Sequence, residues 1–166
     1  AASPDLLGND DLPDPPVYGG KVEAVADYVA GVEPLKALCW AWNRKMVDLC
    51  ARRIQEKLGE KFPVFRIDGA THPTERGRVV EAFQKYPEAV LCATLSSMKE
   101  GISLDTATSA VFAQKSWNPD DNDQAAARIL GPDQKGVPLV VDFVLTDTAE
   151  QLVEDALRVR LQNDGL

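Results

Sequence analysis

Apolar residues recur at two different spacings along this chain, and their alternation predicts both helices and strands. A first helix is predicted from Gly20, where Val22, Val25, Ala26 and Val29 form one apolar face at helical spacing. Five short, partly β-branched apolar runs predict strands, and they cover residues 35–42, 63–67, 89–93, 109–113 and 138–144. Three further helical stripes are formed by Met46, Cys50, Ile54 and Leu58, by Val79, Val80 and Phe83, and by Leu152, Val153, Ala156 and Leu157.

The order of these elements predicts an α/β domain built on a parallel sheet. The strand runs are almost continuously apolar, which is typical of a sheet covered by helices on both faces. Strand–helix–strand units of this length form right-handed crossovers, so we expect at least five mainly parallel strands flanked by helices. Ligands of such sheets bind at the carboxyl ends of the strands. The loops to examine therefore follow Trp42, Ile67, Ala93 and Ala113.

Composition separates a short N-terminal segment from one folded unit. Residues 1–19 are rich in Pro, Asp and Gly and have no apolar period, which is typical of a linker or extended arm. Residues 20–166 are expected to form one domain, because a chain of 166 residues can bury a core without disulfides or metals. The three cysteines lie in apolar runs and indicate a reduced, intracellular protein. No apolar run is long enough to cross a membrane, so no membrane partner is expected.

Charge and residue types exclude several classes of function. His72 is the only histidine, which excludes a Ser/His/Asp or Cys/His catalytic site and argues against any metal centre of the zinc type. A net charge of −8 argues against a nucleic-acid binder that relies on a broad basic surface. Neither GxxxxGK[ST] nor GxGxxG after a strand occurs, which argues against an unrelated Rossmann-like enzyme. Asp68, Asp105 and Asp142, near strand ends, are expected to have turn or solvation roles.

Four segments follow one another in a recognisable order and spacing. They are GGKVEAVADYV, LKALCWAWNRKMVDLCARRI, FRIDGATHPTERGRVVEAFQ, and a stretch that runs from VLCATLSSMKEGISL to SWNPDDNDQAAAR. Together they resemble the second RecA-like lobe of superfamily-two helicases, and most closely the Snf-type DNA translocases related to chromatin remodellers. The likeness covers about residues 20–160. It implies a three-layer RecA-like fold and a helicase C-terminal lobe for residues 20–166.

The resemblance implies that motifs IV and V contact the DNA backbone, and that this DNA is a duplex. The implied DNA-binding residues are Asn43, Arg44, Lys45, Thr94, Ser96, Ser97, Lys99 and Trp117. Arg44 and Lys45 have an alternative interpretation as ordinary charges on a solvated helix start. Motif V departs from the pattern, because its usual glycines are replaced by LSSMKE and its usual asparagine by Ser103.

The resemblance also implies an ATP site in the cleft between two lobes. Gly101, Gln124 and Arg128 would face ATP, and Arg128 would be the catalytic residue that neutralises charge on the γ-phosphate. The phosphate loop belongs to the first lobe in this family. ATP and Mg are therefore expected to bind only when an N-terminal RecA-like lobe is present as a partner, and the isolated chain is expected to be inactive.

Position 131 departs from the family pattern, which has a second arginine there on the same helix face as Arg128. Gly131 cannot replace that cation, and Asp133 places a carboxylate where the pattern has glycine. Both changes disfavour ATP hydrolysis. The alternative to half of a DNA-dependent ATPase is therefore a non-catalytic binding or regulatory module derived from such a lobe.

Overall fold

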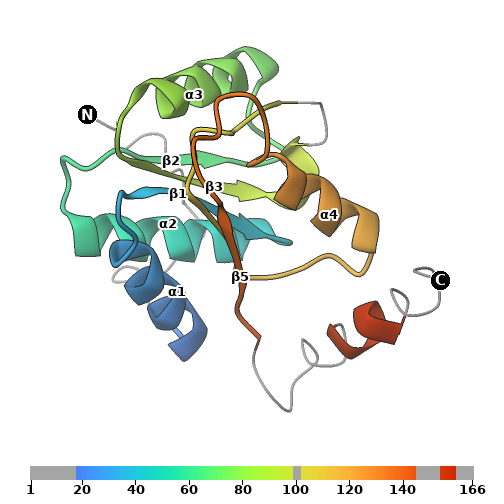
Figure 1. Ribbon diagram of the computed structural model, residues 1–166. Helices are drawn as coiled ribbons and strands as arrows, with labels where there is room; N and C mark the ends of the chain where they lie inside the picture. Colours follow the sequence, from blue (N-terminus) through green and yellow to red (C-terminus); the bar gives the residue numbers. More distant parts are fainter. Residues whose placement is uncertain (1–17, 99–101, 145–153, 160–166) are drawn as a thin grey trace.

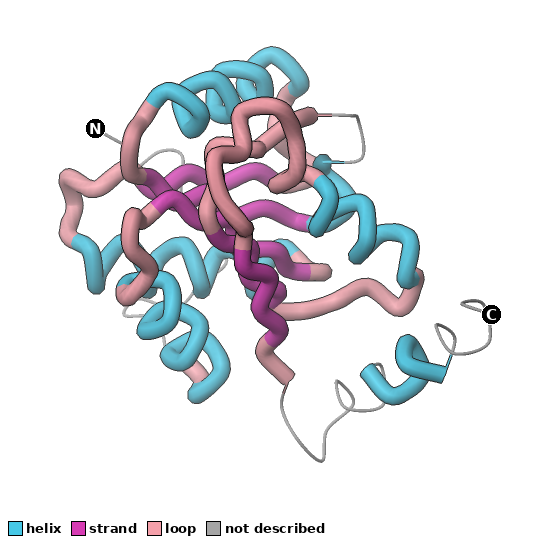
Figure 2. The backbone as a smooth tube through the Cα atoms, viewed as in Figure 1, coloured by secondary structure: helices cyan, strands magenta, loops and turns pink. Residues whose placement is uncertain are grey.

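The computed structural model describes residues 18–98, 102–144 and 154–159, and it alternates strands with helices (Figures 1 and 2). In chain order the elements are α1 (Gly20–Ala30), β1 (Lys36–Ala41), α2 (Arg44–Leu58), β2 (Val64–Ile67), α3 (Pro73–Lys85), β3 (Ala89–Thr94), the 3-10 helix η2 (Leu95–Met98), β4 (Ser109–Phe112), α4 (Pro119–Ala127) and β5 (Leu139–Asp142). A further helix covers residues 154–159. The predicted alternation is confirmed.

The five strands form one sheet in the order β2-β3-β1-β4-β5, and every pairing is parallel. Cys39 of β1 lies opposite Cys92 of β3 and Val111 of β4, so the centre of the sheet is β1. All five carboxyl ends therefore lie along one edge, where the connections to α2, α3, η2 and α4 begin.

Helices cover the two faces of the sheet and produce three layers (Figure 1). On one face, α1 and α2 pack their apolar sides against β1, β2 and β3, and Val25, Ile54 and Val90 are fully buried there. On the other face, α3, α4 and η2 enclose a second core that contains Trp40, Phe83 and Ile129. Leu38 and Trp40 face one core while Cys39 faces the other, because successive strand residues point to opposite faces.

Helix starts follow local chemistry that the sequence shows. Asn43 and Asn118 accept hydrogen bonds from the backbone of the first turns of α2 and α4. His72 caps α3, with Nδ1 accepting from Thr74 N at 3.2 Å, and Pro73 occupies the first helical turn. The single histidine of the chain therefore serves as a helix cap in this structure.

The strand expected at residues 138–144 is shorter and more exposed than its sequence suggests. β5 is an edge strand, and Leu139 and Val140 are 56% and 44% exposed. Full coverage on both faces was the wrong expectation for this strand, since the described helices pack over β1 to β4. The last helix, expected around residues 152–157, is described over 154–159, where Leu157 is buried. The predicted arm lies almost wholly outside the described residues. No helix in the described part of the chain is long and apolar enough to cross a membrane.

Candidate nucleic-acid and ATP-facing site

The start of α2 lies at the carboxyl end of β1 and carries three of the residues expected to contact DNA. Asn43 Oδ1 accepts a hydrogen bond from Met46 N at 2.8 Å, and Asn43 N donates to Gln114 Oε1 at 3.3 Å. Arg44 and Lys45 follow in the first helical turn, and both are exposed. A helix N-terminus with exposed cations is a favourable place for a phosphate oxygen.

A buried ion network joins α2 to β2 directly behind Arg44. The guanidinium of Arg66 pairs with Asp48 on α2 and with Asp68 at the end of β2, and all three side chains are buried. Arg44 Nε contacts Asp68 Oδ2 at 2.9 Å from the solvent side. Burial raises the pKa of Asp48, and the neighbouring Arg66 opposes this shift. The network therefore sets the position of Arg44 at the carboxyl edge.

Asp68 also shapes the loop between β2 and α3. Its Oδ1 accepts hydrogen bonds from Ala70 N at 2.8 Å and from Thr71 N at 3.1 Å. The turn role expected for Asp68 is confirmed by these bonds. Its ion pairs with two arginines were not anticipated, because they depend on β2 and α2 lying side by side.

The segment after β3 exposes only part of the hydroxyl set expected to contact DNA. Ser96 is exposed, whereas Thr94 and Ser97 are 4% and 3% exposed, and Ser97 Oγ donates to Thr94 O at 2.8 Å. Their side chains are turned inward because η2 packs Leu95 and Met98 into the core beneath α4. The expectation of surface contacts from Thr94 and Ser97 is corrected accordingly. Lys99 and Gly101 lie outside the described residues.

Trp117 and Gln124 lie on the connection from β4 and on α4. Trp117 is 57% exposed and directly precedes the cap residue Asn118. The Asn122 side chain fixes this connection, since it accepts from Ser116 N and donates to Ser116 O, each at 2.9 Å. Gln124 is exposed on α4. These hydrogen bonds hold the connection between β4 and α4, which places the exposed indole of Trp117 at the carboxyl edge of the sheet.

Arg128 is the C-cap residue of α4 and is half-buried. Its carbonyl accepts a hydrogen bond from Leu104 N at 2.8 Å, which ties α4 to the segment after η2. The chain leaves α4 through a tighter 3-10 turn, in which Ile129 N donates to Ala126 O and Leu130 N donates to Ala127 O. Position 131 thus lies beyond the helix, so in this chain positions 128 and 131 do not share one helical face.

Gly131 lies against the side chain of Asp105. A Cβ at position 131 would lie 3.0 Å from Asp105 Cγ and closer still to Oδ2. The Asp105 carboxylate already has a hydrogen-bond partner, because its Oδ2 accepts from Asp133 N at 2.9 Å. This bond is the main cause of the lowered pKa of Asp105. Asp133 itself lines a cleft with Lys36 at the amino end of β1, away from the carboxyl edge. Glycine at position 131 therefore has a structural reason.

We expect Gly131→Ala to lower the free energy of unfolding by about 1–3 kcal/mol, since the new methyl group displaces the hydrogen-bonded carboxylate of Asp105. Denaturant unfolding of the chain measures this change. Gly77→Ala is the matched control, because Gly77 is an exposed residue within α3 with no atom near its Cβ position, and it is expected to add roughly 0.5–1 kcal/mol. Equal stability of Gly131→Ala and the unchanged chain would contradict this account.

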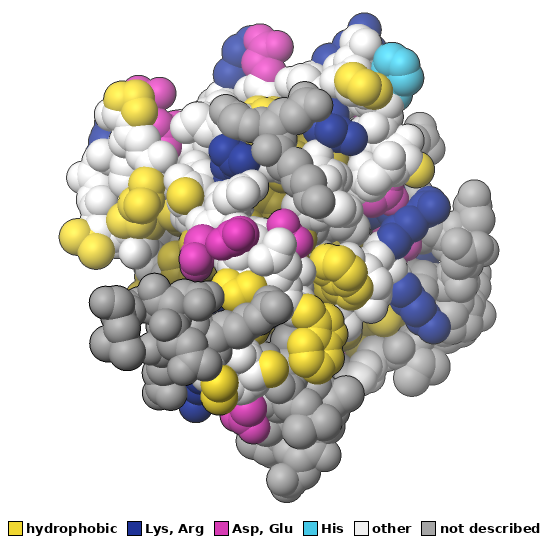
Figure 3. Space-filling view, turned by 90° about the vertical axis from the view of Figure 1, so that its right-hand side faces the viewer, with side chains coloured by type: hydrophobic (Ala, Val, Ile, Leu, Met, Phe, Trp, Pro, Cys, Tyr) yellow, Lys and Arg dark blue, Asp and Glu magenta, His cyan; other side chains and the backbone are white. Residues whose placement is uncertain are grey.

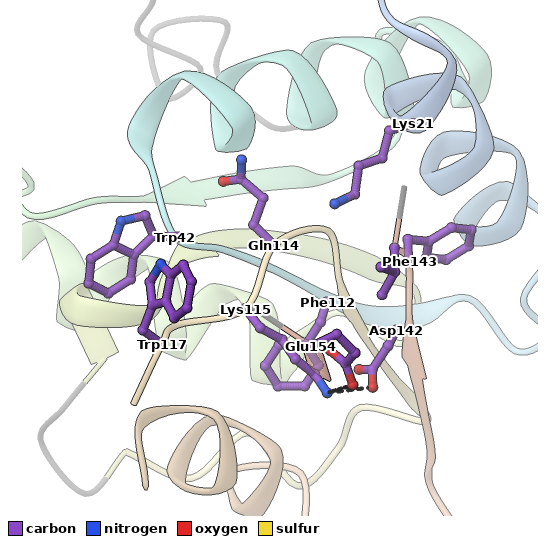
Figure 4. Close-up of a pocket in the computed structure, with 10 residues that line it drawn as sticks. Lys21, Trp42, Phe112, Gln114, Lys115, Trp117, Asp142, Phe143 and Glu154 are labelled. Carbon is purple, nitrogen blue, oxygen red and sulfur yellow. Dashed lines mark hydrogen bonds and ion pairs between the residues drawn. The ribbon is translucent and has the colours of Figure 1, made fainter. Parts of the chain in front are cut away.

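A cleft of about 170 Å³ lies at the carboxyl edge of the sheet. No role was predicted from the sequence for most of the residues that line it. Trp42 and Trp117 form one side of it, and Phe112 and Phe143 line it from the ends of β4 and β5 (Figure 4). Lys115 Nζ contacts Asp142 Oδ2 at 2.6 Å and Glu154 Oε1 at 3.3 Å within the cleft. Trp42 ends the apolar run 35–42, which predicts a strand covered on both faces, yet its side chain is 51% exposed.

No three His, Cys, Asp or Glu side chains in the described part of the chain are arranged to hold a metal ion. Gln124 and Arg128, which the resemblance implies would face ATP, carry an amide and a guanidinium, groups that suit phosphate oxygens rather than a cation.

A five-stranded parallel sheet with exposed cations at its carboxyl edge and an arginine at the end of α4 is the arrangement expected of the second RecA-like lobe of a two-lobed helicase. The chain belongs to the family of the helicase conserved C-terminal domain, whose family model matches residues 20–131. Its relatives are Snf2-type proteins. The SNF2 domain-containing protein CLASSY 2 of Arabidopsis thaliana is 33% identical over 90 residues, which are 53% of this chain and 7% of that protein.

Two further comparisons agree with this membership. The TATA-binding protein-associated factor mot1 of Aspergillus fumigatus is 28% identical over 131 residues, or 78% of this chain and 7% of that protein. The crystal structure of the C-terminal part of the Fun30 ATPase domain superimposes with a TM-score of 0.75 at 18% identity, over 87% of this chain and 49% of that one. The likeness to Fun30 shows the RecA-like fold. The chain spans less than a tenth of the length of both curated relatives.

Proposed function

We propose that this lobe forms half of an ATP-dependent DNA translocase, contributing motifs IV to VI to an ATP site shared with a first lobe and contacting the DNA backbone. The proposal rests on the finding that the exposed residues expected to contact DNA lie together at one edge of the sheet. Asn43, Arg44, Lys45, Ser96 and Trp117 come from three separate segments of the chain, yet each follows a strand at the same edge of one parallel sheet. This edge is where such sheets bind their ligands.

The electrostatics of that edge support contact with phosphates despite the acidic chain. Lys45 is exposed at the start of α2, and Arg44 reaches solvent while Asp68 holds it from behind. In Figure 3, Lys and Arg side chains lie beside hydrophobic side chains on the face that is turned toward the viewer. A few well-placed cations can position a duplex by its backbone without reading its bases.

The proposal assigns the ATP-facing role to Gln124 and Arg128. Arg128 lies at the end of α4, where the hydrogen bond from Leu104 N to its carbonyl fixes the backbone that carries the guanidinium. A guanidinium offers several donors in a fixed plane, which matches the oxygens of a triphosphate. Turnover requires the phosphate loop of a first lobe, so the isolated chain has no ATPase activity of its own.

A second candidate function is a non-catalytic binding or regulatory module, and Gly131 is the observation that favours it. The Asp105 carboxylate fills the space that a side chain at position 131 would need. With one arginine instead of two, the lobe would still dock on a first lobe and on DNA, but its contribution to phosphoryl transfer would be small.

The two candidates are separated by DNA-stimulated ATPase activity of the protein in which this lobe is joined to its first lobe. A translocase half gives turnover that rises with duplex DNA and is absent from the isolated chain. A binding module gives DNA binding without stimulated turnover in either form.

Lys45→Ala tests the DNA face itself. Loss of one phosphate contact is expected to reduce the slope of log affinity against log salt by about one and to weaken binding to all sequences alike. Fluorescence anisotropy with a labelled duplex at several salt concentrations measures the slope. Lys61→Ala is the matched control, because Lys61 is exposed just beyond the opposite end of α2. An unchanged slope in Lys45→Ala would remove this residue from the interface.

A further inference from the structure

The two exposed tryptophans of the cleft stand in equivalent positions. Trp42 directly precedes Asn43, the cap of α2, and Trp117 directly precedes Asn118, the cap of α4. They are 51% and 57% exposed, although indoles are among the side chains that gain most from burial. Two such side chains on one cleft form an apolar patch that indicates a binding surface.

The chemistry of the cleft suits a flat, uncharged ring. Its walls are aromatic, with Phe112 and Phe143 opposite the indoles, and Phe143 is fixed by an edge contact to Tyr28 at 5.8 Å between ring centroids. Two cations line the cleft: Lys21 is buried, and Lys115 is held between two carboxylates, as the dashed lines in Figure 4 show. A phosphate would meet Asp142 and Glu154 here, so the charged part of a ligand must lie outside the cleft.

The exposed cations at the start of α2 provide a place for the phosphate outside the cleft. Arg44 and Lys45 begin α2 just after Trp42 and the cap residue Asn43, so a backbone phosphate at this helix start would lie near the indole. A nucleotide with its phosphate on α2 and its base turned toward Trp42 satisfies both surfaces at once. An apolar protein side chain would use the cleft but would make no use of the exposed charge at the start of α2.

We propose that Trp42 and Trp117 form a stacking site for one unpaired nucleobase, beside the phosphate contacts of α2. The inference rests on the proposed DNA-binding function and deepens it, because it names unpaired or extruded bases as the ligand of this cleft. Stacking on aromatic side chains tolerates any base, since every base has a π face. The site therefore favours distorted over perfectly paired DNA without reading sequence.

The test compares three duplexes of one length: fully paired, with one bulged adenine, and with an abasic bulge. Binding by the protein in which this lobe is joined to its first lobe is measured by fluorescence anisotropy. The bulged adenine is expected to bind about tenfold more tightly than either other duplex, in line with the value of one base–aromatic stack. Trp42→Ala is expected to abolish this preference, and Trp42→Phe to restore most of it.

Val137→Ala is the control for loss of an exposed apolar side chain, because Val137 is 99% exposed and lies away from the cleft, and it should keep the preference. Equal binding of the three duplexes overturns the stacking site and leaves the proposed function standing. No binding to any duplex refutes the proposed function itself. If Trp42→Ala lowers DNA-independent ATPase turnover and leaves the bulge preference intact, the cleft docks the first lobe and the stacking proposal is wrong.

Discussion

Replacing Arg66 by methionine will lower the free energy of unfolding by about 3–5 kcal/mol, because it leaves Asp48 and Asp68 buried without their shared cation. Methionine keeps most of the volume of the arginine stem, so the loss comes from the uncompensated charges rather than from a cavity. Urea unfolding at pH 7 measures it. The effect is large for a single residue because all three members of the network are buried.

The loss in Arg66→Met should depend on pH with a definite sign. Burial already raises the pKa of Asp48, and Arg66 is the first group that lowers it again. Without Arg66 that folded-state pKa rises further, so the folded state holds the proton more tightly than the unfolded state. The deficit is therefore greatest above the folded pKa and shrinks as the pH falls toward the ordinary value of 3.8.

Arg44→Met is the matched variant for this prediction, because Arg44 contacts the same carboxylate of Asp68 from the solvent side. An exposed ion pair of this kind contributes about 1 kcal/mol or less. Two results would contradict this account of the buried network. One is an equally small loss in the free energy of unfolding for both variants, and the other is a loss in Arg66→Met that becomes larger as the pH falls.

Arg128→Gln is expected to reduce DNA-stimulated ATP turnover of the two-lobed protein by about 10³-fold, because it removes the cation assigned to the γ-phosphate. Arg128→Lys should recover little, since an ammonium lacks the planar donor pair of a guanidinium. The rate constant at saturating ATP and DNA is the quantity to measure. DNA affinity without nucleotide should change far less than the rate.

Arg78→Gln on α3 provides the comparison, because Arg78 is exposed and is paired only at 3.9 Å with Glu75. A thermal melt of each variant separates lost chemistry from lost folding. A fall of less than tenfold in Arg128→Gln would mean that another group neutralises the phosphate, and it would favour the non-catalytic module.

The central sheet was accessible from sequence because its signals are local. Runs such as residues 89–93 are apolar at every position, which is typical of a strand covered on both faces. β1 to β4 are buried at every position, as this pattern predicts. The helix starts were equally readable, since Asn43, His72 and Asn118 satisfy backbone donors two or three residues away. β5 is similarly apolar but is largely uncovered by the described helices, and a pattern of hydrophobicity does not encode which elements pack together.

The candidate site was less readable because it depends on contacts between distant residues. Nothing local to Asp48 or Arg66 reveals that α2 and β2 bring them together, and nothing around Trp42 distinguishes an exposed indole from a buried one. Thr94 and Ser97 look like surface hydroxyls until η2 turns them inward. The meaning of Gly131 likewise depended on Asp105, 26 positions earlier in the chain (131 − 105).

The contact between Gly131 and Asp105 disfavours an arginine at position 131. An arginine placed there alone would meet a carboxylate that already accepts a hydrogen bond from Asp133 N, so we expect that variant to be less stable. A tolerated arginine at position 131 is expected to need a second substitution at position 105. Among descendants of this lobe, residues 105 and 131 should therefore change together, with a smaller side chain at 105 wherever 131 carries a large one.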